Sequence, residues 1–192
     1  ILRADYRLEQ PGGHSAGQLV GPGEQAVGFW NKLSAYAKAY NEGRSRRFET
    51  LDPALGDLCT YRDGLNEGVT MVTLSRLPLG LGASTLKEEM ETWRNGAQLE
   101  FYPSDPAVRA DKNTPLVRAL LRAIRCEGGR PRFKLKTGTS DMNVVGPDWN
   151  CPVVAYGPGD SRLDHTPHEH ILVDEFRRAV DVLSRALVLL AA

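Results

Sequence analysis

The stretch VTMVTLSR, residues 69–76, alternates apolar and polar side chains and is rich in β-branched residues. A period of two is typical of a half-buried β-strand. The turn-rich sequence DGLNEG (63–68) precedes it, and a short strand is expected before that turn, near residues 57–62. Residues 57–76 are therefore predicted to form two strands joined by a turn.

Helical patterns flank these two strands. Apolar residues recur at three- and four-residue steps from Ala26 to Tyr40, which is one face of an amphipathic helix, and Gly43 ends the pattern. Downstream, STLKEEMETWRN begins with Ser84, an expected N-cap, carries acidic residues early and is followed by Gly96. Two helices are thus expected, one before and one after the central strands.

Two further strands complete this part of the chain. Residues 2–10 alternate and end at a Pro-Gly-Gly turn, and AQLEFYP (97–103) alternates again. The order β-α-β-β-α-β is that of a ferredoxin-like sandwich, an arrangement that needs no other segment to close. A first domain over residues 1–111 is therefore expected.

The remaining residues, 112–192, have the pattern of part of an α/β domain. TPLVRALLRAIR predicts a helix that is capped by Thr114 and has proline at its first position. RFKLK (132–136) predicts a short strand, and PVVAY (152–156) is an apolar run that suits a strand buried in a parallel sheet. Because two strands make a poor independent sheet, these residues are expected to be half of a domain.

Composition limits the classes of function. The 192 residues are 41% hydrophobic and carry no net charge, which argues against a general nucleic-acid or membrane-surface binder. No apolar run approaches the roughly 20 residues of a membrane helix. Three scattered cysteines without a CxxC motif argue against a disulfide framework or a cysteine-zinc site. We therefore expect a cytoplasmic protein without nucleic acid or membrane as a partner.

Three of the four histidines lie in DHTPHEHI, residues 164–171. The spacing fits neither of the zinc-peptidase helix patterns HExxH and HxxEH. Thr166 to Glu169 instead fits an S/T-x-x-E capping box with proline at the first helical position, so a last helix is expected over about 167–190. His165 then stands just before the cap, on a loop that follows a strand, where ligands bind in α/β sheets. It is a candidate metal ligand, and the alternative is a polar surface loop.

Three more segments carry candidate site residues. In KTGTSDMN, the residues Gly138, Thr139 and Ser140 offer N–H groups and hydroxyls that suit a carboxylate or an oxyanion, or they begin a helix. His14 in PGGHSAG follows two glycines at a strand end, and the alternative is a surface histidine. Arg76 in SRLPLG suits a carboxylate clamp or a surface ion pair.

Taken together and in order, GGHSAG, RLP, GTSD and YGPGDSRLDHTPHEHI resemble the motifs of the two-zinc aminoacylase-like hydrolases. This family includes acetylornithine deacetylase, succinyl-diaminopimelate desuccinylase and carboxypeptidase G. The resemblance covers essentially the whole chain and is greatest to the branch that hydrolyses lysine or ornithine from an amino-group carrier protein. It implies two zinc ions per complete active site, with Co²⁺ as an alternative metal. It also implies a homodimer formed through the first domain, which acts as a lid.

The resemblance implies roles for individual residues. His165 matches the zinc ligand that the C-terminal part of the family supplies. His14 matches the lid histidine that reaches across the dimer, polarises the scissile carbonyl and stabilises the oxyanion. Arg76 and the loop 138–140 match substrate-binding positions. The other metal ligands and the general base belong to an N-terminal half of the family that this sequence does not represent.

We therefore expect the chain to be a fragment of an amide hydrolase that releases lysine or ornithine in lysine or arginine biosynthesis. The fragment alone is expected to be inactive and to hold no stoichiometric zinc. Arg44, Arg46 and Arg47 in GRSRRF are expected either to attract an acidic carrier protein or to be solvated surface. The alternative functions are deacetylation of N-acetyl-ornithine or N-acetyl-lysine, dipeptide hydrolysis, and a non-catalytic dimerisation module.

Overall fold

The computed structural model describes residues 1–13, 20–46, 48–136 and 138–192. The chain forms two compact units. Unit 1 comprises Ile1–Ala107 with Thr137–Thr139, and unit 2 comprises Val108–Lys136 with Ser140–Ala192.

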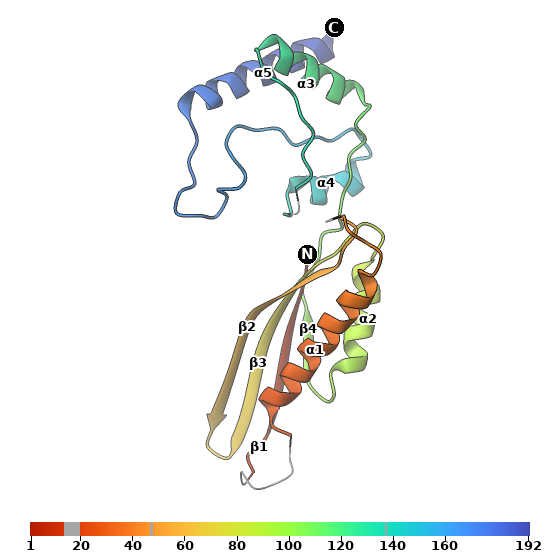
Figure 1. Cartoon of the computed structure of the whole chain (residues 1–192), viewed down its shortest axis with the longest axis vertical. Coiled ribbons are helices and arrows are strands. Elements are labelled where there is room, and N and C mark those ends of the chain that lie inside the picture. The colour runs from red at the N-terminus through yellow and green to blue at the C-terminus, as the bar shows by residue number, and fades with distance from the viewer. Residues whose placement is uncertain (14–19, 47, 137) are drawn as a thin grey trace. The chain divides into compact units, whose positions relative to one another are not determined.

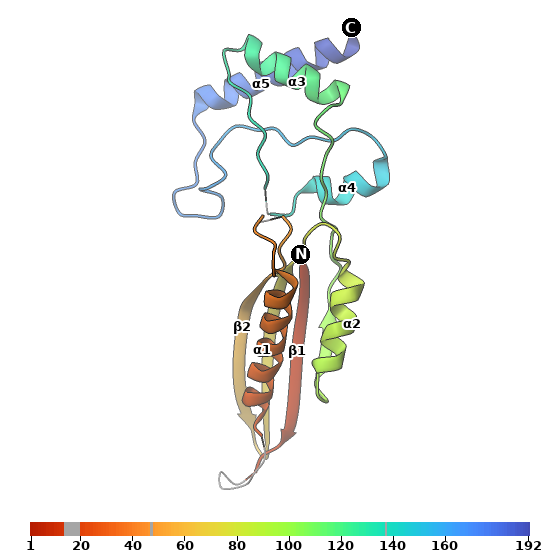
Figure 2. The same ribbon diagram turned by 45° about the vertical axis from the view of Figure 1, so that its right-hand side comes forward.

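Unit 1 is a four-stranded sheet with two helices. Its elements, within the described residues, are β1 (Leu2–Pro11), α1 (Pro22–Tyr40), β2 (Asp52–Asp63), β3 (Asn66–Arg76), α2 (Ala83–Trp93) and β4 (Gln98–Phe101). The strand order is β2-β3-β1-β4, and every neighbouring pair is antiparallel. Both helices lie on the same face of the sheet (Figures 1 and 2). The predicted ferredoxin-like sandwich is confirmed, although β2 is longer than expected.

The core of unit 1 lies between the sheet and its helices. Tyr6 of β1, Phe29 of α1 and Met90 of α2 are at most 2% exposed and belong to one cluster. The rings of Tyr6 and Phe29 lie 5.0 Å apart between centroids. Because side chains alternate between the two faces of a strand, the residues between the buried ones on β1 point to the opposite face.

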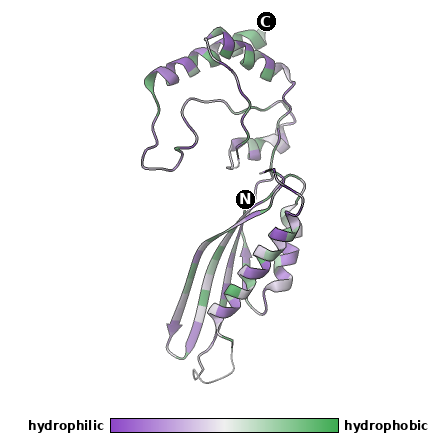
Figure 3. Cartoon of the chain, in the orientation of Figure 1, coloured by the Kyte–Doolittle hydropathy of each residue, from purple (hydrophilic) through white to green (hydrophobic). Residues whose placement is uncertain are grey.

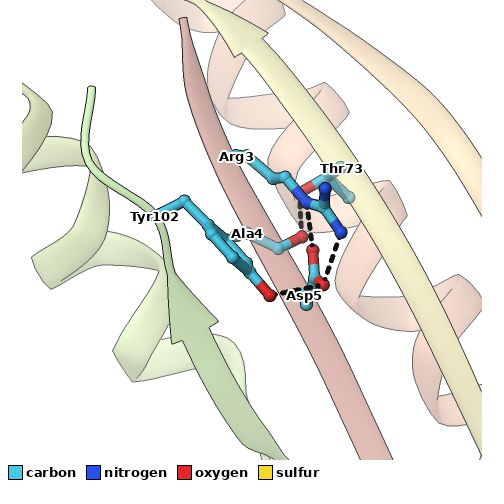
Figure 4. Close-up of polar contacts among 5 residues, drawn as sticks. All are labelled: Arg3, Ala4, Asp5, Thr73 and Tyr102. Atoms are coloured by element: carbon cyan, nitrogen blue, oxygen red, sulfur yellow. Dashed lines mark hydrogen bonds and ion pairs between the residues drawn. The ribbon is translucent and has the colours of Figure 1, made fainter. Parts of the chain in front are cut away.

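That opposite face carries a polar cluster at one end of β1 (Figure 4). The Arg3 guanidinium donates two hydrogen bonds of 2.8 Å to the Asp5 carboxylate and lies 4.5 Å from the centre of the Tyr102 ring. The Tyr102 hydroxyl donates to the same carboxylate at 3.3 Å. The hydrogen bond from Arg3 holds the pKa of Asp5 below its usual value. On the buried face, the Thr73 hydroxyl donates to the Ala4 carbonyl at 3.3 Å.

Helix α2 starts earlier than its sequence pattern predicts. Its N-cap is Gly82, and Ser84, the expected cap, lies in the first turn. Leu81 and Leu86 flank this turn and both pack into the core cluster of unit 1. Apolar residues at these two positions form a hydrophobic staple, which fixes where the chain enters the helix. The predicted helix is confirmed, and the predicted cap is wrong.

Unit 2 is helical within the described residues. Its elements are α3 (Pro115–Cys126), α4 (Asp141–Trp149) and α5 (Val173–Ala191). The predicted cap of α3 is confirmed, since the Thr114 hydroxyl accepts a hydrogen bond of 3.2 Å from the N–H of Val117. Helices α3 and α5 pack through Ala123 and Val182, and hydrophobic and hydrophilic residues alternate along both (Figure 3). Among the described residues, no helix has the length and apolarity needed to cross a bilayer.

Neither predicted strand of unit 2 forms. Residues 132–136 and 152–156 adopt no regular secondary structure. Phe133 and Leu135 of the first segment are 49% and 67% exposed. A strand is stabilised by backbone hydrogen bonds to a neighbouring strand, and the described part of unit 2 provides none. The prediction is wrong for this structure because strand pairing depends on residues distant in sequence.

Candidate functional site

His165 occupies an exposed loop of unit 2 that precedes α5. The N–H of Thr166 donates to the carbonyl of Leu163 at 3.0 Å, which closes a four-residue turn with His165 in third place. The φ angle of His165 is +63°, a left-handed conformation that this turn position usually gives to glycine or asparagine. The His165 imidazole makes no hydrogen bond or ion pair with a described residue. Within the part of the chain that the structure describes, neither ring nitrogen is occupied.

The capping box predicted at Thr166 and Glu169 does not form. The Glu169 carboxylate accepts a hydrogen bond of 3.0 Å from the N–H of His165 rather than from that of Thr166. The N–H of Glu169 in turn donates to the carbonyl of Thr166 at 3.1 Å, which makes a second turn. Helix α5 consequently begins at Val173, not near Pro167, and Asp174 in its first turn faces the positive end of the helix dipole.

One ion pair ties the loop of His165 to another segment of unit 2. The Nζ atom of Lys136 lies 2.6 Å from Oδ2 of Asp164, the residue before His165. Lys136 closely precedes the predicted binding loop 138–140 in the sequence. The pair is partly exposed, and it keeps the segment that ends at Lys136 beside the loop of His165. Sequence spacing gives no signal for this contact, because the two residues are 28 positions apart.

The segment Gly138 to Ser140 leads into α4. Ser140 is the N-cap and Asp141 lies in the first turn, so the interpretation of this segment as a helix start is confirmed. The N–H of Ser140 donates to Oδ1 of Asn143 at 2.9 Å and is therefore occupied. The N–H groups of Gly138 and Thr139 have no partner among the described residues. Donors of this kind are suited to a carboxylate or an oxyanion.

Arg76 belongs to unit 1, whereas His165 belongs to unit 2. Arg76 is the exposed last residue of β3, opposite Asp52 of β2. His14 lies outside the described residues, as does Arg47. Within the described residues, no group of three or more histidine, cysteine, aspartate or glutamate side chains is arranged to hold a metal ion.

Residues 4–188 match the model of the peptidase family M20/M25/M40. The chain belongs to this family. The match covers both units and confirms the resemblance found from the motifs.

Similar proteins share the family and the fold. The chain is 40% identical over 191 residues to the [LysW]-lysine hydrolase of Deinococcus radiodurans, covering 97% of this chain and 53% of that protein. It is 60% identical over 164 residues to a putative [LysW]-lysine/[LysW]-ornithine hydrolase of Thermococcus kodakarensis, covering 85% and 42%. An M20 family metallo-carboxypeptidase from Sulfolobus solfataricus has a similar structure, with a TM-score of 0.73 and 12% identity over 98% of this chain and 58% of that one. The chain thus spans about half the length of the curated relatives it matches.

Proposed function

We propose that the protein carrying this chain is a metal-dependent amide hydrolase that releases lysine or ornithine from an amino-group carrier protein. The 40% identity to a [LysW]-lysine hydrolase across 97% of the chain carries this proposal. In it, residues 1–111 are the lid and dimerisation domain, and residues 112–192 are the C-terminal part of the catalytic domain. The protein acts in the cytoplasm in lysine or arginine biosynthesis, and the three exposed, unpaired cysteines are consistent with a reducing compartment.

The residues present fit a metal site in part. His165 provides an exposed imidazole without a described partner, but a catalytic zinc takes about three protein ligands. We assign His165 as one ligand of a site with two zinc ions, or Co²⁺, whose other ligands lie in the segment that the longer relatives possess. When bound, such a metal polarises the amide carbonyl and lowers the pKa of water.

Residues of this chain are proposed to bind and polarise the substrate. The N–H groups of Gly138 and Thr139, which have no partner among the described residues, and the hydroxyl of Ser140 can donate hydrogen bonds to a carboxylate or to the developing oxyanion. Arg76 binds the substrate carboxylate, and His14 acts on the scissile carbonyl in the neighbouring subunit. Lysine and ornithine differ by one methylene, a difference worth only about 1–3 kcal/mol in a hydrophobic pocket, so we propose that both are accepted.

A homodimer through unit 1 is supported by the edge strand β2. This strand is twelve residues long, has β3 as its one partner strand within the described residues, and has nearly all its residues exposed. A long edge strand presents unpaired backbone groups to a second copy of the same strand. The irregularity between Leu55 and Asp57 divides this edge into two parts.

The carrier protein is proposed to contact the turn after α1. Arg44 is exposed, and its guanidinium lies 4.3 Å from the centre of the Tyr40 ring. Arg46 is exposed and lies 3.5 Å from a Glu49 carboxylate oxygen. These positive groups suit an acidic partner. Reversing Arg44 and Arg46 to glutamate should raise KM for carrier-linked lysine and leave free N-acetyl-lysine turnover unchanged. An unchanged KM for the carrier-linked substrate would overturn this contact.

The function is tested by supplying the full-length protein with lysine linked to its carrier protein, with N-acetyl-lysine, and with a dipeptide. We expect free lysine to be released fastest from the carrier, and His165→Ala to abolish release. Faster turnover of N-acetyl-lysine or of the dipeptide would show that the proposed carrier-linked substrate is wrong and that the faster substrate is the better assignment. Absence of all three activities would favour a non-catalytic dimerisation module.

A further inference from the structure

We propose that Glu169 is a positioning residue for the metal ligand His165, and that it acts on the backbone of the ligand instead of on its ring. This inference rests on the proposed function, because it takes His165 as a ligand. It starts from the observation that the one described hydrogen bond of the Glu169 side chain is accepted from the N–H of His165, at 3.0 Å.

The backbone of His165 needs such support. Its left-handed conformation is unfavourable for a residue with a Cβ, and only three described residues other than glycine adopt a positive φ. The other two, Asn95 and Asn150, are asparagines, which tolerate this conformation. A histidine keeps it only when neighbouring contacts define the turn.

Glu169 supplies the contact that is specific to His165. The turn around the histidine is closed by hydrogen bonds from the N–H and the hydroxyl of Thr166 to the carbonyl of Leu163, at 3.0 and 2.8 Å. These two bonds fix the ends of the turn but leave the N–H of His165 without a partner. The Glu169 carboxylate reaches back four residues to accept that N–H, and a charged acceptor makes this bond stronger than a neutral one would.

The direction of the imidazole follows from the backbone. The φ angle sets where the Cα–Cβ bond of His165 points, and the ring itself is not held by any described side chain. In most metal sites the second ring nitrogen of a histidine is oriented by a carboxylate or carbonyl. Here the orienting carboxylate of Glu169 contacts the peptide N–H of His165 instead of its ring. The cost of losing it should therefore resemble that of losing an outer-shell partner, about 10- to 100-fold in metal affinity.

Glu175 provides a matched control. It is also a glutamate near the start of α5, six residues further along, and it makes no described hydrogen bond or ion pair. Substitutions at Glu175 remove the same charge from the same region without touching the turn of His165.

The test uses the full-length protein with Co²⁺ as the probe. Dissociation constants are measured by competition with a chelator, and the visible d–d absorption reports the coordination. We expect Glu169→Ala to weaken one of the two metal equivalents about 10- to 100-fold and to alter the d–d bands. Glu169→Gln, which keeps a neutral acceptor, should recover part of the affinity. Glu175→Ala and Glu175→Gln should match the wild type.

His165→Ala separates failure of this inference from failure of the proposed function. If His165→Ala binds two equivalents of Co²⁺ as tightly as the wild type, the assignment of His165 as a ligand is wrong. If His165→Ala loses one equivalent but Glu169→Ala keeps wild-type affinity and spectrum, the assignment stands and the positioning role is wrong. Equal losses in the Glu169 and Glu175 variants would also overturn it, since they would reflect charge alone.

Discussion

Two glycine-to-alanine substitutions in unit 1 should change its stability in opposite directions. Gly68 of β3 lies opposite Tyr61 of β2, whose hydroxyl donates a hydrogen bond of 3.0 Å to Glu9 of β1. A Cβ at Gly68 would lie 2.9 Å from Cε1 of the Tyr61 ring and closer still to Cζ. The ring would have to move away from Glu9. Gly28 is inside α1, and apart from its chain neighbours and the adjoining backbone of the helix, no described atom lies within 4 Å of the corresponding position.

These contacts give the magnitudes. Alanine at Gly28 should stabilise the chain by about 0.5–1 kcal/mol, because it restricts the unfolded state and favours the helix. Alanine at Gly68 gains a similar entropic benefit but displaces the Tyr61 ring. The lost hydrogen bond and the lost ring packing together cost about 1.5–2.5 kcal/mol. The net effect at Gly68 is therefore a loss of about 1 kcal/mol.

Thermal unfolding followed by circular dichroism measures both effects. For a chain of this size, 1 kcal/mol corresponds to roughly 2–4 °C in Tm. Gly28→Ala should raise Tm and Gly68→Ala should lower it. Tyr61→Phe provides the control, since its cost should shrink in the Gly68→Ala background, where the hydrogen bond to Glu9 is already lost. Shifts of the same sign, or fully additive costs of Gly68→Ala and Tyr61→Phe, would refute the argument.

Three further predictions concern individual side chains. The buried Tyr6 hydroxyl has no hydrogen-bond partner among the described residues, so Tyr6→Phe should leave the urea unfolding free energy unchanged or raise it by up to about 1 kcal/mol. The hydrogen bond from Arg3 lowers the pKa of Asp5 in the folded state. The Asp5 carboxylate therefore stabilises the fold above about pH 4, and this stabilisation is lost as pH falls through the lowered pKa. The Tm values of wild type and Asp5→Asn should converge as pH falls from 6 to 2. Leu187 is 67% exposed, so Leu187→Gln should change Tm little and should reduce self-association of the isolated chain in light scattering.

Local signals predicted unit 1 well. The strands could be predicted because a period of two records burial on one face, and β1 and β3 bury every second residue under the helices. The cap at Thr114 was also predictable, because its bond to Val117 spans only three residues. The cap at Ser84 was not, since the staple of Leu81 and Leu86 depends on the tertiary core.

The candidate site also depends on contacts that local sequence patterns do not predict. The spacing of Thr166 and Glu169 suggests a capping box, but the glutamate accepts from His165 instead. The deciding feature is the positive φ of His165, a conformation that a histidine rarely adopts and that no periodicity encodes. The ion pair of Lys136 and Asp164 likewise joins residues far apart in sequence. The sequence could indicate which residue is the candidate ligand, but not what holds it.

Three independent features of unit 2 support the proposal that another part of the protein completes the catalytic domain. The residues Phe176, Val180, Leu183 and Leu187 form an exposed apolar stripe on α5, on a different face from the residues that contact α3. The segments 132–136 and 152–156 have strand patterns, but the described part of unit 2 contains no strand with which they could pair. Within the described residues His165 is a single candidate ligand, whereas a metal site needs several. A sheet packed on the stripe would bury it, pair both segments and bring further ligands to the loop that follows the second one. When the rest of the catalytic domain packs on unit 2, Leu187 should therefore become buried and the metal should become tightly bound at the same time.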